Sequence, residues 1–369
     1  MSARIDCDLL TGFLGSGKTT LLNAWLRSPQ SAGTAVVVNE VGDIGVDQLV
    51  LAQVTDTVML LESGCLCCTL SGSLRETLLD LCATARAANA PLSRIVIETT
   101  GLAEPLPILH SLLGDKILME TIRLNQVIVT VDGQQGLKQL SSQPESVRQL
   151  AAAECVVVTK SDLASPQSLT DLRHAMNNLN PVATIVNSIG GDAAVPVFTA
   201  TAGEPQRRAV VEALKEMRPG LQRHASCNHE DQHAHGIASD HEHHALFHSR
   251  VSTLGFYIDH EITWSGLAAW WHLVSSHYGD SLLRSKGLLH INDSARPQVF
   301  MQTVGKVFHS PDVIPAWPDT DLRSRLVCIG VSLDEEWLRR SLAALRIDEP
   351  GLMPSTLAEL SFLVSTQSE

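Results

Sequence analysis

The stretch Gly12-Phe13-Leu14-Gly15-Ser16-Gly17-Lys18-Thr19 decides the fold of the amino-terminal half of the chain, because it matches the pattern G-x-x-x-x-G-K-[ST]. In this pattern glycines let successive backbone N–H groups turn toward a phosphate, the lysine adds a charge, and the threonine hydroxyl can bind Mg²⁺. The apolar run Ile5–Leu10 predicts a buried strand before the loop, and Thr19–Leu26 predicts a helix after it, ending before Ser28-Pro29. A strand, a glycine-rich loop and a helix N-terminus together predict a phosphate-binding site.

Further apolar runs follow the first, and helix-length segments separate them. They are Ala35–Val38, Val58–Leu61, Arg94–Ile97, Gln126–Val131 and Cys155–Val158. Fully apolar strands that alternate with helices are typical of a parallel sheet covered on both faces. The sequence therefore predicts a doubly wound α/β domain over residues 1–220.

A chain of 369 residues is long for one core, so we expect a second domain. Residues 221–248 lose all apolar periodicity and predict a histidine-rich linker. Residues 249–369 predict a small α+β domain with a strand at 250–258, a helix at 264–274, strands within 282–291, 298–308 and 324–329, and a helix at 333–345. Ser332-Leu333-Asp334-Glu335 predicts a capping box for that last helix, with Ser332 as N-cap.

The composition limits the function classes. A net charge of −13 without a cluster of Lys and Arg disfavours general binding to nucleic acid or anionic membranes. No apolar run approaches the ~20 residues that span a bilayer, and residues 1–6 lack the start of a signal peptide. We therefore expect a cytoplasmic protein. In a reducing compartment, clustered members of its 8 cysteines are metal or redox candidates rather than disulfides.

A base-reading loop is predicted at Thr159-Lys160-Ser161-Asp162, directly after an apolar run. A carboxylate accepts from N1–H and N2–H₂ of guanine but faces no such donor pair on adenine. Asp162 would therefore select GTP over ATP, with the stem of Lys160 along the base. The alternative is an ordinary solvated turn.

A second acidic segment, Ile97-Glu98-Thr99-Thr100-Gly101, ends another apolar run. Glu98 can reach Mg²⁺ through water, and the N–H of Gly101 can approach a γ-phosphate because glycine has no Cβ. A helix N-terminal carboxylate is the alternative for Glu98. We expect Lys18, Thr19, Glu98 and Gly101 to be the catalytic residues.

Three thiols lie within four residues of Ser63-Gly64-Cys65-Leu66-Cys67-Cys68. Thiolates this close repel one another, and a soft cation such as Zn²⁺ holds them together. In an extended chain Cys65 and Cys67 share one face, so a turn near Gly64 must bring the sulfur of Cys68 round. Glu40 or a linker histidine could be the fourth ligand. An open fourth position predicts a site that exchanges its metal.

The predicted linker mixes imidazoles with carboxylates, which suits labile collection of Zn²⁺, Co²⁺ or Ni²⁺. A merely solvated linker is the alternative. Its candidate ligands are His224, Cys227, His229, His233, His235, His241, His243, His244 and His248. The cysteines at 7, 82, 155 and 328 lie inside apolar runs, and we expect them in the core.

Several of these segments together resemble the CobW-type metallochaperone GTPases. They are G-F-L-G-S-G-K-T-T (12–20), N-E-V-G-D-I-G-V-D (39–47), S-G-C-L-C-C (63–68), E-T-T-G-L-A-E-P (98–105) and T-K-S-D (159–162). The resemblance extends to R-S-K-G (284–287) and R-L-V-C-I-G (325–330), so it covers nearly the whole chain. It implies GTP hydrolysis by the first domain, metal on the cysteines, and delivery of zinc or cobalt to a client.

The resemblance also implies roles for individual residues. The residues implied to bind phosphates and Mg²⁺ are Gly12, Gly15, Ser16, Gly17, Lys18, Thr19 and Thr20. Those implied to bind guanine are Thr159, Lys160 and Asp162. Those implied to bind metal are Cys65, Cys67 and Cys68, with Glu40 as a candidate metal or switch ligand. The acidic loop with Gly42, Asp43, Gly45 and Asp47 suits a switch segment that orders around Mg²⁺ and the γ-phosphate. The chain departs from the family pattern twice. Val41 replaces the usual aromatic residue, which bears on the packing of this switch, and Thr159 replaces the more common asparagine, which bears on one contact to guanine.

We therefore expect a GTPase that uses GTP, Mg²⁺ and Zn²⁺ (or Co²⁺) and delivers metal to a client metalloprotein. A homodimer is one assembly to test. GTP would order the switch and close the thiolate site, and hydrolysis would release the ion. Two alternatives stay open at this point. One is a phosphate-loop kinase for a small molecule, and the other is a metal buffer or storage protein in which nucleotide binding is incidental.

Overall fold

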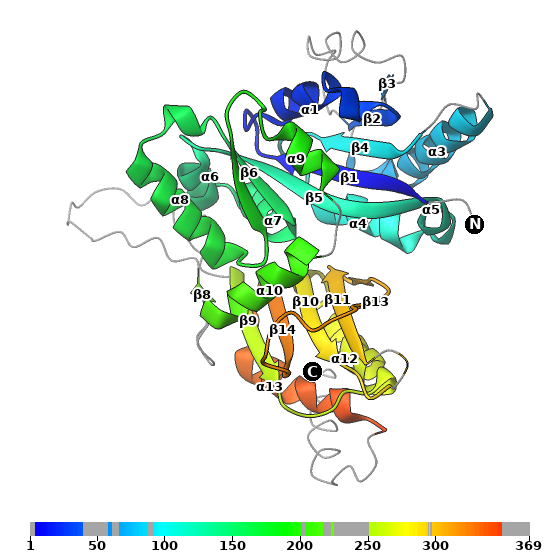
Figure 1. Ribbon diagram of the computed structural model, residues 1–369, viewed down its shortest axis with the longest axis vertical. Helices are drawn as coiled ribbons and strands as arrows, with labels where there is room; N and C mark the ends of the chain where they lie inside the picture. The colour runs from blue at the N-terminus through cyan, green and yellow to red at the C-terminus, as the bar shows by residue number, and fades with distance from the viewer. Residues whose placement is uncertain are drawn as a thin grey trace. The chain divides into compact units, whose positions relative to one another are not determined.

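The computed structural model describes residues 4–39, 58–60, 66–87, 92–200, 204–216, 223–224, 251–293, 295 and 297–348. Two compact units make up the chain (Figure 1). The first consists of Met1–Met176 and Ala183–Gly203, and the second of Asn177–Val182 and Glu204–Glu369.

The first unit is built on a seven-stranded sheet with the strand order β3-β2-β4-β1-β5-β6-β7, and its paired strands are parallel (Figure 1). The strands are β1 Ile5–Gly12, β2 Thr34–Asn39, β3 Val58–Leu60, β4 Arg94–Thr99, β5 Ile122–Asp132, β6 Cys155–Thr159 and β7 Thr184–Ser188. The predicted apolar runs all lie in strands as far as the structure describes them; Leu61 lies outside the described residues. The sequence did not predict β7, because this edge strand is only partly buried and therefore carries no apolar run.

Helices cover both faces of this sheet (Figure 1). On one face α1 and α9 pack against strand residues such as Val36 and Ile128, and the ring of Trp25 stacks on Phe198 at 5.3 Å. On the other face lie α3, α4 and α7. The prediction of a doubly wound α/β domain is confirmed. The helices are α1 Lys18–Leu26, η1 Pro29–Ser31, α3 Leu66–Ala87, α4 Pro105–Gly114, α5 Lys116–Thr121, α6 Gly136–Ser142, α7 Pro144–Ala152, η2 Ser161–Leu163, α8 Pro166–Leu179 and α9 Ala194–Thr199.

The second unit contains an antiparallel sheet with the order β12-β11-β10-β14-β9-β8, and β13 pairs with β11. Helices α12 and α13 pack on it around Trp270, Phe256 and Leu326. The predicted α+β fold is confirmed. Its elements are α10 Glu204–Glu216, β8 Arg223–His224, β9 Val251–Ile258, α12 Trp264–Tyr278, η3 Gly279–Ser281, β10 Leu282–His290, β11 Gln298–Val304, β12 Val307–Phe308, β13 Asp312–Val313, β14 Ser324–Val331, α13 Glu335–Ser341 and η4 Leu342–Arg346.

Helix α10, which we placed in the first domain from the sequence, packs against β10 and β14 and belongs to the second unit. The expected linker at 221–248 lies outside the described residues except for Arg223 and His224, which form β8. The linker and the domain boundaries at 220 and 248 therefore stay predictions.

The predicted capping box of α13 is wrong. Ser332 has a left-handed backbone with a φ of 53°, and the helix begins at Glu335. The N-cap is Asp334, whose Oδ1 accepts a 3.0 Å hydrogen bond from the N–H of Trp337. A carboxylate caps a helix as well as a serine hydroxyl does, so the cap falls two residues later than predicted.

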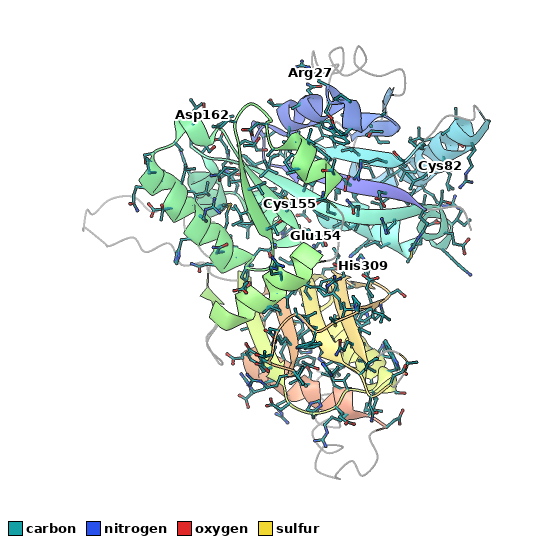
Figure 2. All side chains as sticks on the ribbon, in the orientation of Figure 1. Arg27, Cys82, Glu154, Cys155, Asp162 and His309 are labelled. Atoms are coloured by element: carbon teal, nitrogen blue, oxygen red, sulfur yellow. The ribbon has the colours of Figure 1, made fainter. Side chains whose placement is uncertain are left out.

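The isolated cysteines lie in the core, as predicted. Cys7, Cys82, Cys155 and Cys328 are all buried; Cys155 lies in β6 and Cys82 on α3 (Figure 2). Burial raises the pKa of Cys155 to about 11 and that of Cys328 to about 12. These thiols therefore stay protonated at neutral pH and are poor metal ligands.

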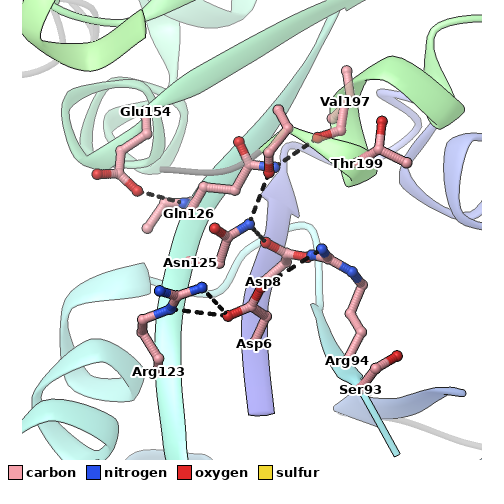
Figure 3. A network of polar contacts seen from close by, with 12 residues as sticks. Asp6, Asp8, Ser93, Arg94, Arg123, Asn125, Gln126, Glu154, Val197 and Thr199 are labelled. Atoms are coloured by element: carbon pink, nitrogen blue, oxygen red, sulfur yellow. Dashed lines mark hydrogen bonds and ion pairs between the residues drawn. The ribbon is translucent and has the colours of Figure 1, made fainter. Parts of the chain in front are cut away.

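A buried polar network lies on strands β1, β4 and β5 of the first sheet (Figure 3). Asp8 is fully buried and forms an ion pair with Arg94. The Nδ2 of Asn125 donates to Asp8 Oδ1 at 2.8 Å and to the carbonyl oxygen of Ala200 at 3.2 Å. Burial raises the pKa of Asp8 to about 6, although Arg94 and Asn125 act in the opposite direction. The network satisfies a carboxylate that could not otherwise be buried.

Candidate functional site

The phosphate loop connects the end of β1 at Gly12 to the start of α1 at Lys18. Gly17 is the N-cap of α1 and has a φ of 91°, a conformation that side-chain-bearing residues rarely adopt. Ser16, fully buried, shares a 2.6 Å hydrogen bond between its Oγ and the Oγ1 of Thr130 on β5. The loop is therefore seated on the strand beside it. Thr130 was missed from the sequence, where it is simply one polar residue within an apolar run.

The ammonium group of Lys18 lies over the loop. Its Nζ donates to the carbonyl oxygens of Gly12 at 2.8 Å and Phe13 at 3.2 Å. An ammonium group has three donors, and this one stands at the N-terminal end of α1, where the helix dipole also favours an anion. The arrangement supports binding of a phosphate group.

Thr19 and Glu98 bring two oxygen ligands together beside the loop. The Oγ1 of Thr19 donates to Oε1 of Glu98 at 2.8 Å, and Glu98 is 5% exposed. Strands β1 and β4 are adjacent and in register here, with Leu10 opposite Glu98. A hydroxyl and a carboxylate are oxygen ligands of the kind that Mg²⁺ prefers, so the residues present fit this ion. Thr20 follows Thr19 in α1 and is exposed.

The turn after β4, which contains Gly101, packs closely against the phosphate loop. A Cβ on Gly101 would lie 2.6 Å from both the backbone nitrogen and Cδ2 of Leu14, so only glycine fits. Two residues of α7 hold the other side of this turn. Nε2 of Gln149 donates to the carbonyl oxygens of Gly101 at 3.1 Å and Ala103 at 3.0 Å, and Arg148 forms an ion pair with Glu104. No pattern in the sequence marks either residue, because they lie in an ordinary amphipathic helix.

The predicted base-reading loop is tied to the phosphate loop by two hydrogen bonds. Oγ1 of Thr159 donates to the carbonyl oxygen of Ser16 at 2.6 Å, and Nζ of Lys160 donates to that of Gly15 at 2.8 Å. Asp162 lies in the next turn, η2, and is exposed at the surface (Figure 2). The threonine that stands in place of the usual asparagine thus bonds the phosphate loop directly.

Asp132, at the end of β5, orients Lys160 and was missed from the sequence. Its Oδ2 accepts a 2.6 Å hydrogen bond from Lys160 Nζ, and its Oδ1 accepts from the N–H groups of Gln134 at 2.8 Å and Gln135 at 3.1 Å. Burial opposes ionisation of Asp132, but these hydrogen bonds outweigh it and lower its pKa. The carboxylate therefore stays charged and holds the lysine.

The structure thus gathers most of the predicted nucleotide residues at one edge of the first sheet. Those linked there by the contacts above are Gly12, Gly15, Ser16, Gly17, Lys18, Thr19, Glu98, Gly101, Thr159 and Lys160. Their roles in binding and catalysis stay predictions.

The predicted metal ligands are only partly covered. Glu40, Cys65 and the expected switch at 42–47 lie outside the described residues. Helix α3 begins at Leu66, so the backbone at Cys67 and Cys68 is helical. The turn expected near Gly64 lies outside the described residues, and the ligand roles of the cysteines stay predictions. Within the described ranges, no three His, Cys, Asp or Glu side chains are placed to hold a metal ion. The described helices also include none long and apolar enough to cross a membrane.

A parallel α/β unit that carries this phosphate loop, followed by an α+β unit, defines a class of phosphate-loop NTPases. Two family models match the chain: the CobW/HypB/UreG nucleotide-binding domain over residues 7–187, and the cobalamin synthesis protein cobW C-terminal domain over residues 251–346. The chain belongs to the CobW family of phosphate-loop GTPases. The resemblance seen in its motifs is confirmed.

Curated relatives match the chain to different extents. The chain is 29% identical over 343 residues to the zinc chaperone YjiA of Escherichia coli, a match that covers 93% of this chain and 99% of YjiA. It is 29% identical over 194 residues to zinc-regulated GTPase metalloprotein activator 1 of Schizosaccharomyces pombe, covering 51% of this chain and 46% of that protein. The crystal structure of Zn(II)-bound YjiA GTPase matches the fold with a TM-score of 0.61 at 24% identity, over 93% of this chain and 99% of that one.

Proposed function

We propose that this protein is a GTP-dependent metallochaperone. It hydrolyses GTP in the first unit, binds zinc (or cobalt) through Cys65, Cys67 and Cys68, and delivers the ion to a client metalloprotein. The observation that supports the proposal is the sheet topology: β1, which precedes the phosphate loop, and β3, which precedes the cysteine motif, are strands of one parallel sheet, so both segments follow the carboxyl ends of its strands.

The nucleotide half of the proposal rests on the contacts around the phosphate loop. Lys18 would hold the phosphates, and Thr19 and Glu98 would hold Mg²⁺, which would supply charge neutralisation at the phosphates. Asp162 would accept hydrogen bonds from guanine. The loop that bears Asp162 is fixed to the phosphate loop through Thr159 and Ser16, so base and phosphates would be held at a set spacing.

The metal half rests on sheet topology. Strand β2 lies between β3 and β4, with Val38 opposite Leu60 on one side and Glu98 on the other. Strand β2 ends at Asn39, at the carboxyl edge of the sheet, between the strand that contains Glu98 and the strand that precedes the cysteines. Adjacent strands are about 4.8 Å apart, which puts β3 about 14 Å from β1. We therefore expect the segment after Asn39 to respond to nucleotide and to act on the thiols, which supports a role for Glu40 as metal or switch ligand.

The kind of metal follows from ligand chemistry. Thiolates favour soft ions such as Zn²⁺ over Mg²⁺. The relatives named as zinc chaperones support zinc as the cargo. A client protein is the destination that a chaperone requires, and the name metalloprotein activator of the fission-yeast relative supports it.

Nucleotide turnover tests the enzymatic part of the proposal. The wild-type protein with Mg²⁺ is expected to release phosphate from GTP and far less from ATP, and Asp162→Asn is expected to reduce that preference, because an amide places a donor against guanine donors. Preferential use of ATP would favour the small-molecule kinase. A zinc affinity that does not respond to nucleotide would favour the metal buffer.

A further inference from the structure

Gln149 holds the turn that follows β4 through its side-chain amide. It lies on α7, is fully buried, and touches the turn that follows β4 rather than the phosphate loop itself. Its Nε2 donates to the carbonyl oxygens of Gly101 and Ala103 at 3.1 and 3.0 Å. One side-chain amide therefore spans the turn that carries the expected γ-phosphate contact.

The orientation of this amide is fixed by its partners. Both partners are carbonyl oxygens, which only accept hydrogen bonds, so only the NH₂ group can face them. Gln149, Ser146 and Phe13 line a cavity of about 10 Å³. Gln149 Oε1 and Ser146 Oγ are buried with no hydrogen-bond partner among the described residues. The amide is thus held by the two bonds that it donates to the turn.

The turn is held from both sides. On one side Gly101 already stands so close to Leu14 of the phosphate loop that a Cβ would lie 2.6 Å from its backbone nitrogen. No side chain therefore fits between the turn and the loop at this point. On the other side, the two hydrogen bonds from Gln149 oppose movement of the turn away from the loop. The backbone of Gly101 is therefore packed close to the phosphate loop and tied to α7.

We propose that Gln149 is a positioning residue for recognition of the γ-phosphate. It acts through Gly101, whose N–H faces a γ-phosphate only while the turn stays against Leu14. The inference rests on the proposed function, because it requires that GTP is the bound nucleotide. GDP lacks the γ-phosphate, so Gln149 contributes to affinity for GTP and little to affinity for GDP.

The test compares the two nucleotides in the full-length protein. Dissociation constants for GDP and for a non-hydrolysable GTP analogue with Mg²⁺ are measured for wild type and for Gln149→Met, which keeps the volume and removes the amide. The matched control is Gln139→Met, because Gln139 lines the same cavity and donates to neither carbonyl. We expect Gln149→Met to lower the affinity for the analogue roughly 10-fold, as for the loss of two hydrogen bonds. Its affinity for GDP, and both affinities of the control variant, should stay within about twofold of wild type.

An equal loss of affinity for both nucleotides in Gln149→Met would show that Gln149 is merely structural. Unchanged affinities would show that it does not position the turn. Either result overturns the inference and leaves the proposed function standing. A wild-type protein that binds neither guanine nucleotide would overturn the proposed function, and the inference with it.

Gln149→Glu keeps the inference testable if the methionine variant does not fold. A carboxylate would face two carbonyl oxygens and push the turn away, whereas the protonated acid could donate one bond again. We expect selective loss of affinity for the analogue near pH 8 and partial recovery near pH 6, relative to wild type at each pH. A loss of affinity that does not change with pH would contradict the positioning role.

Discussion

The hydroxyl of Thr159 donates a 2.6 Å hydrogen bond to the carbonyl oxygen of Ser16, and this bond joins the predicted base-reading loop to the phosphate loop. Thr159 is 7% exposed, and its Oγ1 also lies 3.3 Å from the carbonyl oxygen of Val131. An asparagine would bring a larger amide to this place. Threonine thus departs from the family pattern and still links the two loops.

Removal of this hydroxyl is expected to lower the affinity for GDP and for GTP equally. Thr159→Val keeps the shape but leaves the oxygen of Ser16 without its donor, which costs about 1–3 kcal/mol for a buried group. We expect affinities for GDP and for a GTP analogue to fall roughly 10-fold together, since the bond sets the spacing between base and phosphate sites. Calorimetric titration measures both affinities. Thr159→Ser, which keeps the hydroxyl, is the control, and wild-type affinity in the valine variant would contradict a tethering role.

The lysine of the phosphate loop is expected to be essential for turnover and dispensable for folding. Lys18 is partly exposed, and its Nζ donates to the loop carbonyl oxygens of Gly12 and Phe13, so Lys18→Ala removes a positive charge from the phosphate site without removing a fully buried apolar side chain. We expect GTP hydrolysis to fall by at least 100-fold, as for loss of a preorganised charge at a phosphoryl group, with an unchanged melting temperature. Lys306→Ala in the second unit, where the side chain is 51% exposed, removes the same charge and should leave turnover intact. Turnover near wild type in Lys18→Ala would exclude the assigned role of the loop.

How much of this arrangement the sequence predicts depends on the range of the contacts involved. The phosphate loop is a local pattern, so a motif of eight residues that includes Gly17 and Lys18 is enough to predict its conformation. Gln149, Asp132 and Thr130 contact the loops from distant elements, and such contacts depend on the packing of the sheet rather than on spacing along the chain. The cap at Asp334 was missed for a related reason. Its choice over Ser332 is set by the left-handed backbone at Ser332.

The buried carboxyl of Asp8 is expected to give a measurable pH dependence of stability. Its pKa in the folded protein is about 6, above the ordinary value of 3.8, mainly because of burial. A raised pKa means that the folded state binds the proton more tightly than the unfolded state. Stability contributed by Asp8 is therefore greatest below about pH 4, falls as pH rises to about 6, and is level above that.

Comparison with Asp8→Asn isolates this effect. We expect the free energy of unfolding of wild type, measured by urea denaturation, to fall relative to Asp8→Asn by on the order of 2 kcal/mol between pH 4 and pH 6. Other titrating groups contribute to both proteins and cancel in the difference. A difference that grows in favour of wild type with rising pH would instead mean that the ion pair with Arg94 dominates over burial.

The cysteine motif and the nucleotide are expected to be coupled in binding. If GTP orders the segment that begins at Glu40 and completes the metal site, GTP must tighten zinc binding, and zinc must tighten GTP binding by the same factor. We expect a coupling of roughly 1–3 kcal/mol, or about 5–150-fold in affinity. Thiolates must lose protons before they bind metal, so the effect should fade as pH falls below neutrality.

Zinc titrations with and without a non-hydrolysable GTP analogue measure this coupling directly. Replacement of Cys65 and Cys67 by serine should abolish it and spare binding of GTP alone, because hydroxyls fill a similar volume but are poor ligands for soft ions. Cys82→Ala, which removes a buried thiol of the same unit, should leave the coupling in place, because Cys82 lies in the core and outside the motif. Equal zinc affinities in the two titrations would refute delivery driven by GTP even if both ligands bind, since a nucleotide that does not change metal affinity cannot drive its release.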